Sequence, residues 1–169
     1  NLQNYKNIIF PMHQEYISDN ILEKLVELMN KYNINIISIG GANFLNKVKF
    51  NYHNNNLLNI TYYNDDNERI DYKKYNLNTY NYTFNKDCRY ISDEDFLKNI
   101  FFTGEVMDYQ KNTNSESFFF NIKTKTGVKL PVFTITKYEK GKLIQFNSDY
   151  VSARLLESKK LTDFFRKLI

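Results

Sequence analysis

The chain has 169 residues, a net charge of +4 and 17% aromatic residues. A chain of this length buries roughly 70% of the surface that its unfolded form exposes, so we expect one domain over residues 1–169, and the single Cys88 excludes a disulfide framework. No apolar run approaches the roughly 18 residues of a membrane-spanning helix, and the lysines are scattered, so we expect neither a membrane protein nor a nucleic-acid-binding protein.

The first residue is Asn1 rather than Met. We therefore expect the chain to be a piece of a longer protein, with an upstream domain or a partner chain beside it.

Residues 8–39 have the pattern of a strand, a helix and a strand. Ile8 to Phe10 form a short apolar run, and Ile34 to Ile39 form a second run rich in β-branched residues. Between them, apolar residues recur every three or four positions from about Asp19 to Tyr32, after Ser18, which is a good N-cap. Two strands joined by a helix form a right-handed parallel unit, so we predict adjacent parallel strands.

Polar clusters follow each of these strands. His13, Glu15 and Tyr16 follow the first, and Gly40, Gly41 and Asn43 follow the second. Sites in parallel sheets gather at the carboxyl ends of the strands, so the two clusters should be neighbours. His13 and Glu15 then share one side of an extended segment, where they serve either as a metal or catalytic pair or as groups that hold the loop and cap the helix.

The stretches FPMHQEYIS and SIGGANFLNKVKF, with the later KGKLIQFNSDYVS, resemble the C-terminal domain of the N,N-dimethylformamidase large-subunit family. More broadly, they are similar to class I glutamine amidotransferase-like domains. The resemblance implies an α/β fold of three layers, flavodoxin-like, with a mostly parallel sheet from residues 7–50 and an extension of antiparallel hairpins near residues 105–147. Full domains of this kind begin with further strand–helix units.

The resemblance implies a hydrolase that acts on the C–N bond of a small amide, with Glu15 as an iron ligand and His13 as the catalytic residue beside it. Iron or zinc is the metal to expect. The family's other iron ligands are tyrosines from sequence before this segment, where Tyr5 is the sole tyrosine here and lies at the opposite end of the strand. The alternative is a non-catalytic α/β domain used for binding or assembly.

Gly40 and Gly41 stand where class I amidotransferases carry a cysteine nucleophile, and no Cys, Ser or Thr replaces it here. Glutaminase chemistry by that mechanism is therefore not expected. The glycines allow close packing or bind an anion through their amides, and Asn43 either orients a substrate amide or closes the turn. After the strand Leu143 to Phe146, Asp149 is either a partner of His13 or the cap of the next segment.

The remaining elements have simpler patterns. Leu57 to Tyr63 is a predicted strand, and the tyrosines of residues 72–90 are expected to pack over loops rather than to form a binding platform. Ser92 begins a predicted helix that includes Phe101, with Asp93 to Asp95 as acids of its first turn. Strands are predicted at 105–109, 117–124, 130–138 and 143–146, with Pro131 at a strand start or an edge, and a last helix at 158–169.

The apolar positions of the best-defined elements give the predicted core. These are Ile8, Phe10, Leu22, Leu25, Leu28, Ile37, Ile39, Phe133, Ile135, Ile144, Phe146, Leu161 and Phe165.

Overall fold

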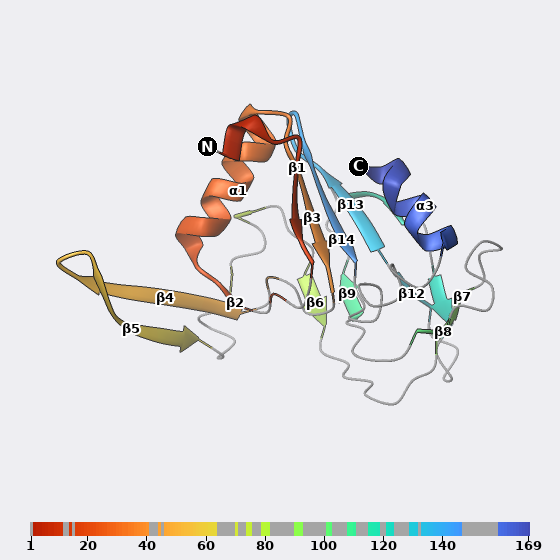
Figure 1. Cartoon of the computed structure of the whole chain (residues 1–169). Helices are drawn as coiled ribbons and strands as arrows, with labels where there is room; N and C mark the ends of the chain where they lie inside the picture. Colours follow the sequence, from red (N-terminus) through yellow and green to blue (C-terminus); the bar gives the residue numbers. More distant parts are fainter. Residues whose placement is uncertain are drawn as a thin grey trace.

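The computed structural model describes residues 2–11, 14, 16–40, 44, 46–63, 70, 74–75, 79–81, 90–92, 101–102, 108–110, 115–118, 121–123, 129–131, 133–146 and 159–169. Five predicted site residues lie outside these ranges: His13, Glu15, Gly41, Asn43 and Asp149. The chain is a mixed α/β protein (Figure 1).

The first unit consists of β1 (Asn7–Phe10), α1 (Asp19–Lys31) and β3 (Asn35–Ile39), after a 3-10 turn, η1 (Leu2–Asn4). β1 and β3 pair in parallel, with Asn7 opposite Asn35. The predicted strand–helix–strand unit is therefore confirmed.

Ser18 and Asn33 determine where α1 begins and ends. Ser18 has extended backbone angles and its hydroxyl accepts a hydrogen bond from the Ile21 N–H at 3.4 Å, which makes it the N-cap. Tyr32 caps the other end, where its N–H donates to the Leu28 carbonyl at 3.1 Å. The next residue, Asn33, has a φ of 49°, in the left-handed region that Asn tolerates and that ends a helix.

A five-stranded sheet continues this unit in the order β1-β3-β14-β13-β10. β14 (Lys142–Phe146) pairs with β3 in parallel, whereas β13 (Phe133–Lys137) and β10 (Ser115–Phe118) follow antiparallel. β13 and β14 thus form an antiparallel hairpin that extends the parallel strands, as expected for residues 105–147, and the sheet as a whole is mixed. The short turn at residues 138–141 requires this, because so tight a connection joins only antiparallel strands.

β4 does not belong to this sheet. β2 (Tyr16–Ile17), β4 (Asn46–His53) and β5 (Asn56–Tyr63) form a separate three-stranded sheet in that order. Residues 7–50 therefore supply two sheets, where we expected one. Pro11 follows β1 directly, and proline cannot donate to a ladder, so β1 ends there and the chain resumes pairing in β2.

Two smaller sheets complete the described strands. One has four strands in the order β12 (Lys129–Pro131), β11 (Asn121–Lys123), β7 (Tyr90–Ser92) and β8 (Phe101–Phe102). The other pairs β6 (Thr79–Asn81) with β9 (Asp108–Gln110).

These strands decide two predictions. The helix predicted from Ser92 through Phe101 is wrong at both ends, because Ser92 ends β7 and Phe101 begins β8; residues 93–100 are outside the described ranges. The β-branched and aromatic residues at 90–92 and 101–102 favour strands, and they prevail over the acidic helix-start signal. Pro131 ends β12, which is an edge strand as predicted.

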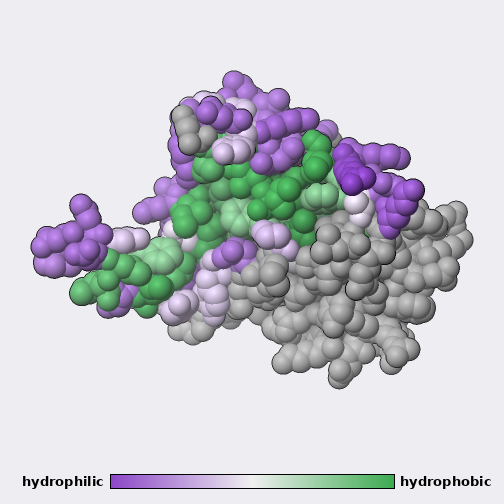
Figure 2. Space-filling model, in the orientation of Figure 1, coloured by the Kyte–Doolittle hydropathy of each residue, from purple (hydrophilic) through white to green (hydrophobic). Residues whose placement is uncertain are grey.

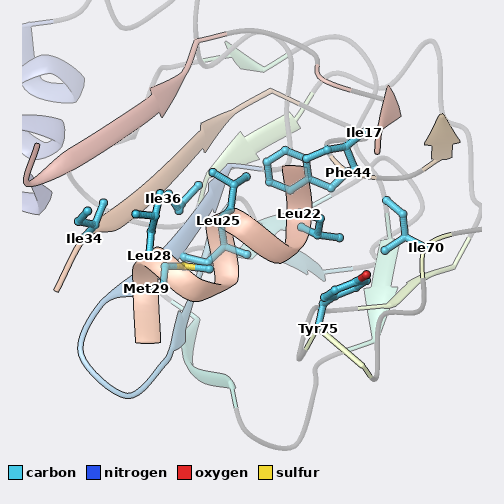
Figure 3. Close-up of a cluster of buried hydrophobic side chains, with 11 residues drawn as sticks. Ile17, Leu22, Leu25, Leu28, Met29, Ile34, Ile36, Phe44, Ile70 and Tyr75 are labelled. Carbon is cyan, nitrogen blue, oxygen red and sulfur yellow. The ribbon is translucent and has the colours of Figure 1, made fainter. Parts of the chain in front are cut away.

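α1 packs its apolar side on one face of the five-stranded sheet. Leu22, Leu25 and Leu28 are buried there beside Ile36 of β3 (Figure 3), and Leu143 of β14 belongs to the same cluster. The cluster also contains Ile17, Met29, Ile34, Phe44, Ile70 and Tyr75.

α3 (Lys159–Leu168) packs elsewhere on the sheet. Phe165 of this helix contacts Phe146 of β14, with ring centroids 6.1 Å apart. The final carbonyl, that of Ile169, accepts hydrogen bonds from Lys6 Nζ and Asn7 Nδ2, both at 3.2 Å. α1 and α3, the helices described here, are too short and too polar to cross a membrane.

The predicted core is largely confirmed. Buried members are Leu22, Leu25, Leu28, Ile37, Ile39, Ile144, Phe146 and Leu161. Half-buried members are Ile8, Phe10, Ile135 and Phe165, whereas the side chain of Phe133 is outside the described part.

Candidate functional site

The segments that follow β1 and β3 run side by side. The Phe44 N–H donates a hydrogen bond of 2.8 Å to the Gln14 carbonyl. Two residues further on, Tyr16 of β2 pairs in parallel with Asn46 of β4. Gln14 stands between His13 and Glu15, and Phe44 follows Asn43, so the described neighbours of both predicted clusters are in contact.

Phe44 has a backbone conformation that needs explanation. Its φ is 58°, which is rare for a bulky residue. The residue is 1% exposed, and its ring meets Phe10 edge-on at 5.4 Å. Packing against the end of β1 therefore compensates for the backbone strain, and strain of this kind gathers at binding and catalytic sites.

Gly40 ends β3 in a conformation that requires glycine. Its φ is 146°, and the residue is buried. A Cβ is disfavoured at that φ, so the backbone at the end of β3 requires glycine. This observation favours a conformational role for Gly40 over the alternative that its amide binds an anion.

Tyr16, the other described residue of the predicted site, lines a small pocket. The pocket has a volume of about 240 Å³ and is lined by Phe10, Gln14, Tyr16, Ile17, Ser18, Ile21, Val48 and Phe50. Its wall is mainly apolar. Of its polar groups, the Ser18 hydroxyl already accepts from Ile21, and the Gln14 amide nitrogen donates to the Tyr16 carbonyl at 3.1 Å.

Val48 and Phe50 of β4 line this pocket, but they are not among the site residues predicted from the sequence. The pairing of β2 with β4 brings them there. The alternation of Val48, Lys49 and Phe50 could have indicated that Val48 and Phe50 share an apolar face of a strand.

A wider groove adjoins the pocket. It has a volume of about 720 Å³ and lies between the start of α1 and the β4–β5 hairpin. Asp19 and Lys47 form an ion pair inside it. The hydrogen bond to Asp19 raises the pKa of Lys47, so this lysine stays a cation and is not a proton-transfer group near neutral pH.

A charged cluster stands at the outer side of α1. Lys74 Nζ is 2.7 Å from Glu23 Oε1 and 3.0 Å from the Tyr75 hydroxyl. The hydrogen bond from Lys74 lowers the pKa of Glu23, and burial raises the pKa of Tyr75. The cluster holds the hydroxyl of Tyr75, one of the tyrosines expected to pack over loops; Tyr75 instead belongs to the core cluster, with 3% of its surface exposed.

A row of buried polar side chains crosses the sheet on the α1 face. Ser38, Gln145 and Thr134 are opposite one another on β3, β14 and β13, and none is more than 2% exposed. Ser38 Oγ is fully enclosed and has no hydrogen-bond partner in the described part of the chain. The sequence pattern predicts Ser38 only as a strand residue and does not indicate that three buried polar side chains lie side by side.

The metal prediction concerns residues outside the described ranges. Among the described residues, no three His, Cys, Asp or Glu side chains are grouped as a metal site would require. Tyr5 precedes β1, is 60% exposed and is separated from Pro11 by the whole strand. The four residues of β1 span about 13 Å, so Tyr5 and Pro11 lie at opposite ends of this strand, as expected.

Compared with protein-family models and with curated proteins, the chain matches none.

Proposed function

We propose that this chain is the α/β part of a hydrolase that cleaves the C–N bond of a small amide at the carboxyl ends of β1 and β3. The observation that supports this most is the 2.8 Å hydrogen bond between Phe44 N–H and the Gln14 carbonyl. It joins the segment of His13 and Glu15 to the segment of Gly41 and Asn43, beside a pocket of about 240 Å³.

The proposal gives each residue a role. His13 takes a proton from water as the water oxygen bonds to the amide carbon, and it returns the proton to the nitrogen as the C–N bond breaks. The products are a carboxylic acid and an amine. Asn43 orients the amide, and Asp149 holds the His13 ring.

Binding and positioning fall to the other predicted residues. The pocket beside Tyr16 is apolar and suits small alkyl groups on the amide, and glycine at positions 40 and 41 would let the backbone approach the substrate.

The carboxylate of Glu15 is a ligand type that suits iron or zinc, beside the catalytic His13. Such an ion would polarise the amide carbonyl. One ligand does not complete a site, so we propose that the other ligands come from outside the described residues or from an upstream or partner chain.

We also propose a three-layer, flavodoxin-like arrangement for the fold. α1 packs on the side of Ile36 and Leu143, whereas α3 contacts Phe146. Since alternate strand residues point to opposite faces, Leu143 and Phe146 belong to different faces, which supports a helix on each side of the sheet.

The test is amine release from a panel of small N-alkyl formamides and acetamides by the protein with its natural upstream sequence and any partner chain, with iron or zinc supplied. His13→Ala should reduce the rate at least about 100-fold, in the range of a lost acid–base group, and Glu15→Gln should reduce it through the loss of a metal ligand. His53→Ala is the matched control, because His53 is exposed at the far end of β4, and it should keep the rate. If wild type and all variants release amine equally, or none does with metal present, the proposal fails.

One observation favours the alternative of a binding or assembly domain. The β4–β5 hairpin exposes Tyr52, Leu57, Leu58, Ile60 and Tyr62. Such a surface is typical of an interface.

A further inference from the structure

The β4–β5 hairpin has one polar face and one apolar face. Asn51, Asn59 and Thr61 share the polar face, where Asn51 Nδ2 donates to Asn59 Oδ1 at 2.6 Å and to Thr61 Oγ1 at 3.1 Å. The alternate positions carry Phe50 opposite Ile60 and Val48 opposite Tyr62. Directly opposite residues of an antiparallel pair share a face, so these four form the apolar side.

The bulge near the tip extends this apolar side. The register shifts between Asn51 and Tyr52, so that Tyr52 lies opposite Leu57 and Leu58 is the extra residue. Leu58 is 69% exposed and Tyr52 is 63% exposed. The five exposed apolar side chains of the hairpin carry on the order of 500 Å² of surface, near the upper limit that a monomer leaves as one apolar patch.

The hairpin stands away from the rest of the molecule. Figure 1 shows β4 and β5 reaching outward beyond the start of α1, and Figure 2 shows hydrophobic residues along the hairpin with a hydrophilic tip. The tip contains Asn54 and Asn55, both at positive φ. A two-stranded ribbon is marginally stable on its own, so a further layer or strand would stabilise it.

β5 is the edge of its sheet in the described part of the chain. Its residues, Asn56–Tyr63, include no charged residue and no proline. Natural edge strands usually carry a charge, a proline, an inward-pointing lysine or a bulge that prevents pairing with another chain. β5 has no charge, proline or lysine, its one register shift lies near its start at Leu58, and seven of its eight residues are exposed.

We propose that β5 pairs antiparallel with β5 of a second copy of this chain, so that two three-stranded sheets become one of six strands. A second copy is favoured because β5 is self-complementary. With the two-fold axis at Ile60, Leu58 lies opposite Tyr62 and Asn59 lies opposite Thr61, so apolar groups meet apolar groups and polar groups meet polar ones.

Other registers are poorer. A shift of one residue places apolar side chains opposite polar ones, because side chains alternate with period two. A two-fold axis at Asn59 pairs Leu58 with Ile60, but it places Leu57 opposite Thr61 and Asn56 opposite Tyr62. No like charges face each other across the seam, since β5 is uncharged and Lys47 and Lys49 belong to the inner strand. This assembly is independent of the hydrolase proposal.

Sedimentation equilibrium of the full chain tests the pairing. Wild type should be a dimer at about 100 μM, and Ile60→Lys should weaken dimerisation at least about tenfold, because two like charges then stand opposite each other on the axis. Tyr52→Lys is the matched control: it lies on the same apolar face but on β4, so it should leave the dimer intact. A monomeric wild type, or an Ile60→Lys variant that still dimerises, overturns the proposal. Loss of the dimer in Tyr52→Lys also overturns it, since that result would mean that two hairpins associate through their apolar faces rather than through the β5 edges.

Cross-linking tests the register independently of any loss of folding. In a Cys88→Ser background, Ile60→Cys should form a covalent dimer on mild oxidation, because residues on the axis have Cβ atoms about 4.5–5.5 Å apart. Lys49→Cys, on the inner strand, should stay monomeric. Equal cross-linking of both variants, or of neither, contradicts the register.

Discussion

Ser18 and Ser38 present the same hydroxyl to two different surroundings. Ser18 Oγ accepts a hydrogen bond from the first turn of α1, whereas Ser38 Oγ is enclosed without a partner in the described part of the chain. A buried polar group without a hydrogen bond costs free energy, and removing it is neutral or favourable.

We therefore expect opposite results from the same substitution. Ser18→Ala should lower the free energy of unfolding by about 0.5–2 kcal/mol through the lost cap, and Ser38→Ala should leave it unchanged or raise it. Urea denaturation of both variants makes the comparison. A loss above about 1 kcal/mol for Ser38→Ala would show that its hydroxyl is bonded.

Gly141 is required by a close approach of two backbones. A Cβ at this residue would stand 2.1 Å from the carbonyl oxygen of Ile34, and the Gly141 N–H donates to the Met29 carbonyl at 2.6 Å. The turn between β13 and β14 therefore packs directly on the segment that links α1 to β3.

Gly141→Ala should lower the free energy of unfolding by about 1–3 kcal/mol, the cost of overpacking, since the clash is with backbone that cannot rotate away. Glu139→Ala, in the same turn and exposed, should change it by less than about 0.5 kcal/mol. Thermal melts of the two variants would be compared. Equal melting temperatures would mean that the turn lies further from Ile34.

At the scale of elements, α1 was well predicted because several local signals agree. Ser18, the three-and-four spacing of its apolar residues and the end near Tyr32 all favour the same helix, and the helix begins and ends within one residue of expectation. The helix predicted from Ser92 through Phe101 is wrong at its two ends, where its acidic start and apolar spacing did not outweigh the strand-forming residues at 90–92 and 101–102.

The apolar face of α1 contributes most to its stability. Leu25 is 5% exposed within the core, whereas Ile21, one turn earlier, is 44% exposed. Leu25→Ala should cost about 2–5 kcal/mol, and Ile21→Ala should cost well under half of that, as judged by chemical denaturation. Similar losses of unfolding free energy for both variants would mean that Leu25 is not on the buried face of α1.

The polar side of α1 gives a pH dependence. The hydrogen bond from Lys74 lowers the pKa of Glu23 below its usual 4.5. A carboxyl whose pKa is lower in the folded state stabilises the fold above its unfolded pKa, and this contribution is lost as the pH falls through the folded value.

Wild type should therefore lose stability on acidification from about pH 5 to pH 3, and Glu23→Gln should lose less over the same interval. Melting temperatures across that range provide the measurement. The two proteins losing equal amounts would mean that the Lys74 contact is absent in solution.

At the scale of the whole molecule, the parallel unit was predictable and the division into sheets was not. The alternation that identifies β4 and β5 as strands does not specify their neighbours, because pairing depends on where the chain turns at Gly40 and Phe44. The polar row through Ser38 was also missed, since its burial follows from tertiary packing.

Most residues of the predicted site lie outside the described ranges. Its topological basis, two loops at the ends of parallel strands, agrees with the contact between Gln14 and Phe44. The residues that would carry the chemistry stay predictions, with Tyr16 and Gly40 the two whose positions are described.

The central claim is that the loops after β1 and β3 converge on one site, and disulfide trapping tests it most directly. In a Cys88→Ser background, His13→Cys with Asn43→Cys should close an intramolecular disulfide on mild oxidation, seen as a loss of two free thiols in the monomer. Lys47→Cys with Tyr63→Cys is the positive control, since these residues are direct partners of β4 and β5. Closure of the site pair supports convergence; free thiols at positions 13 and 43, with the control pair closed, would contradict it.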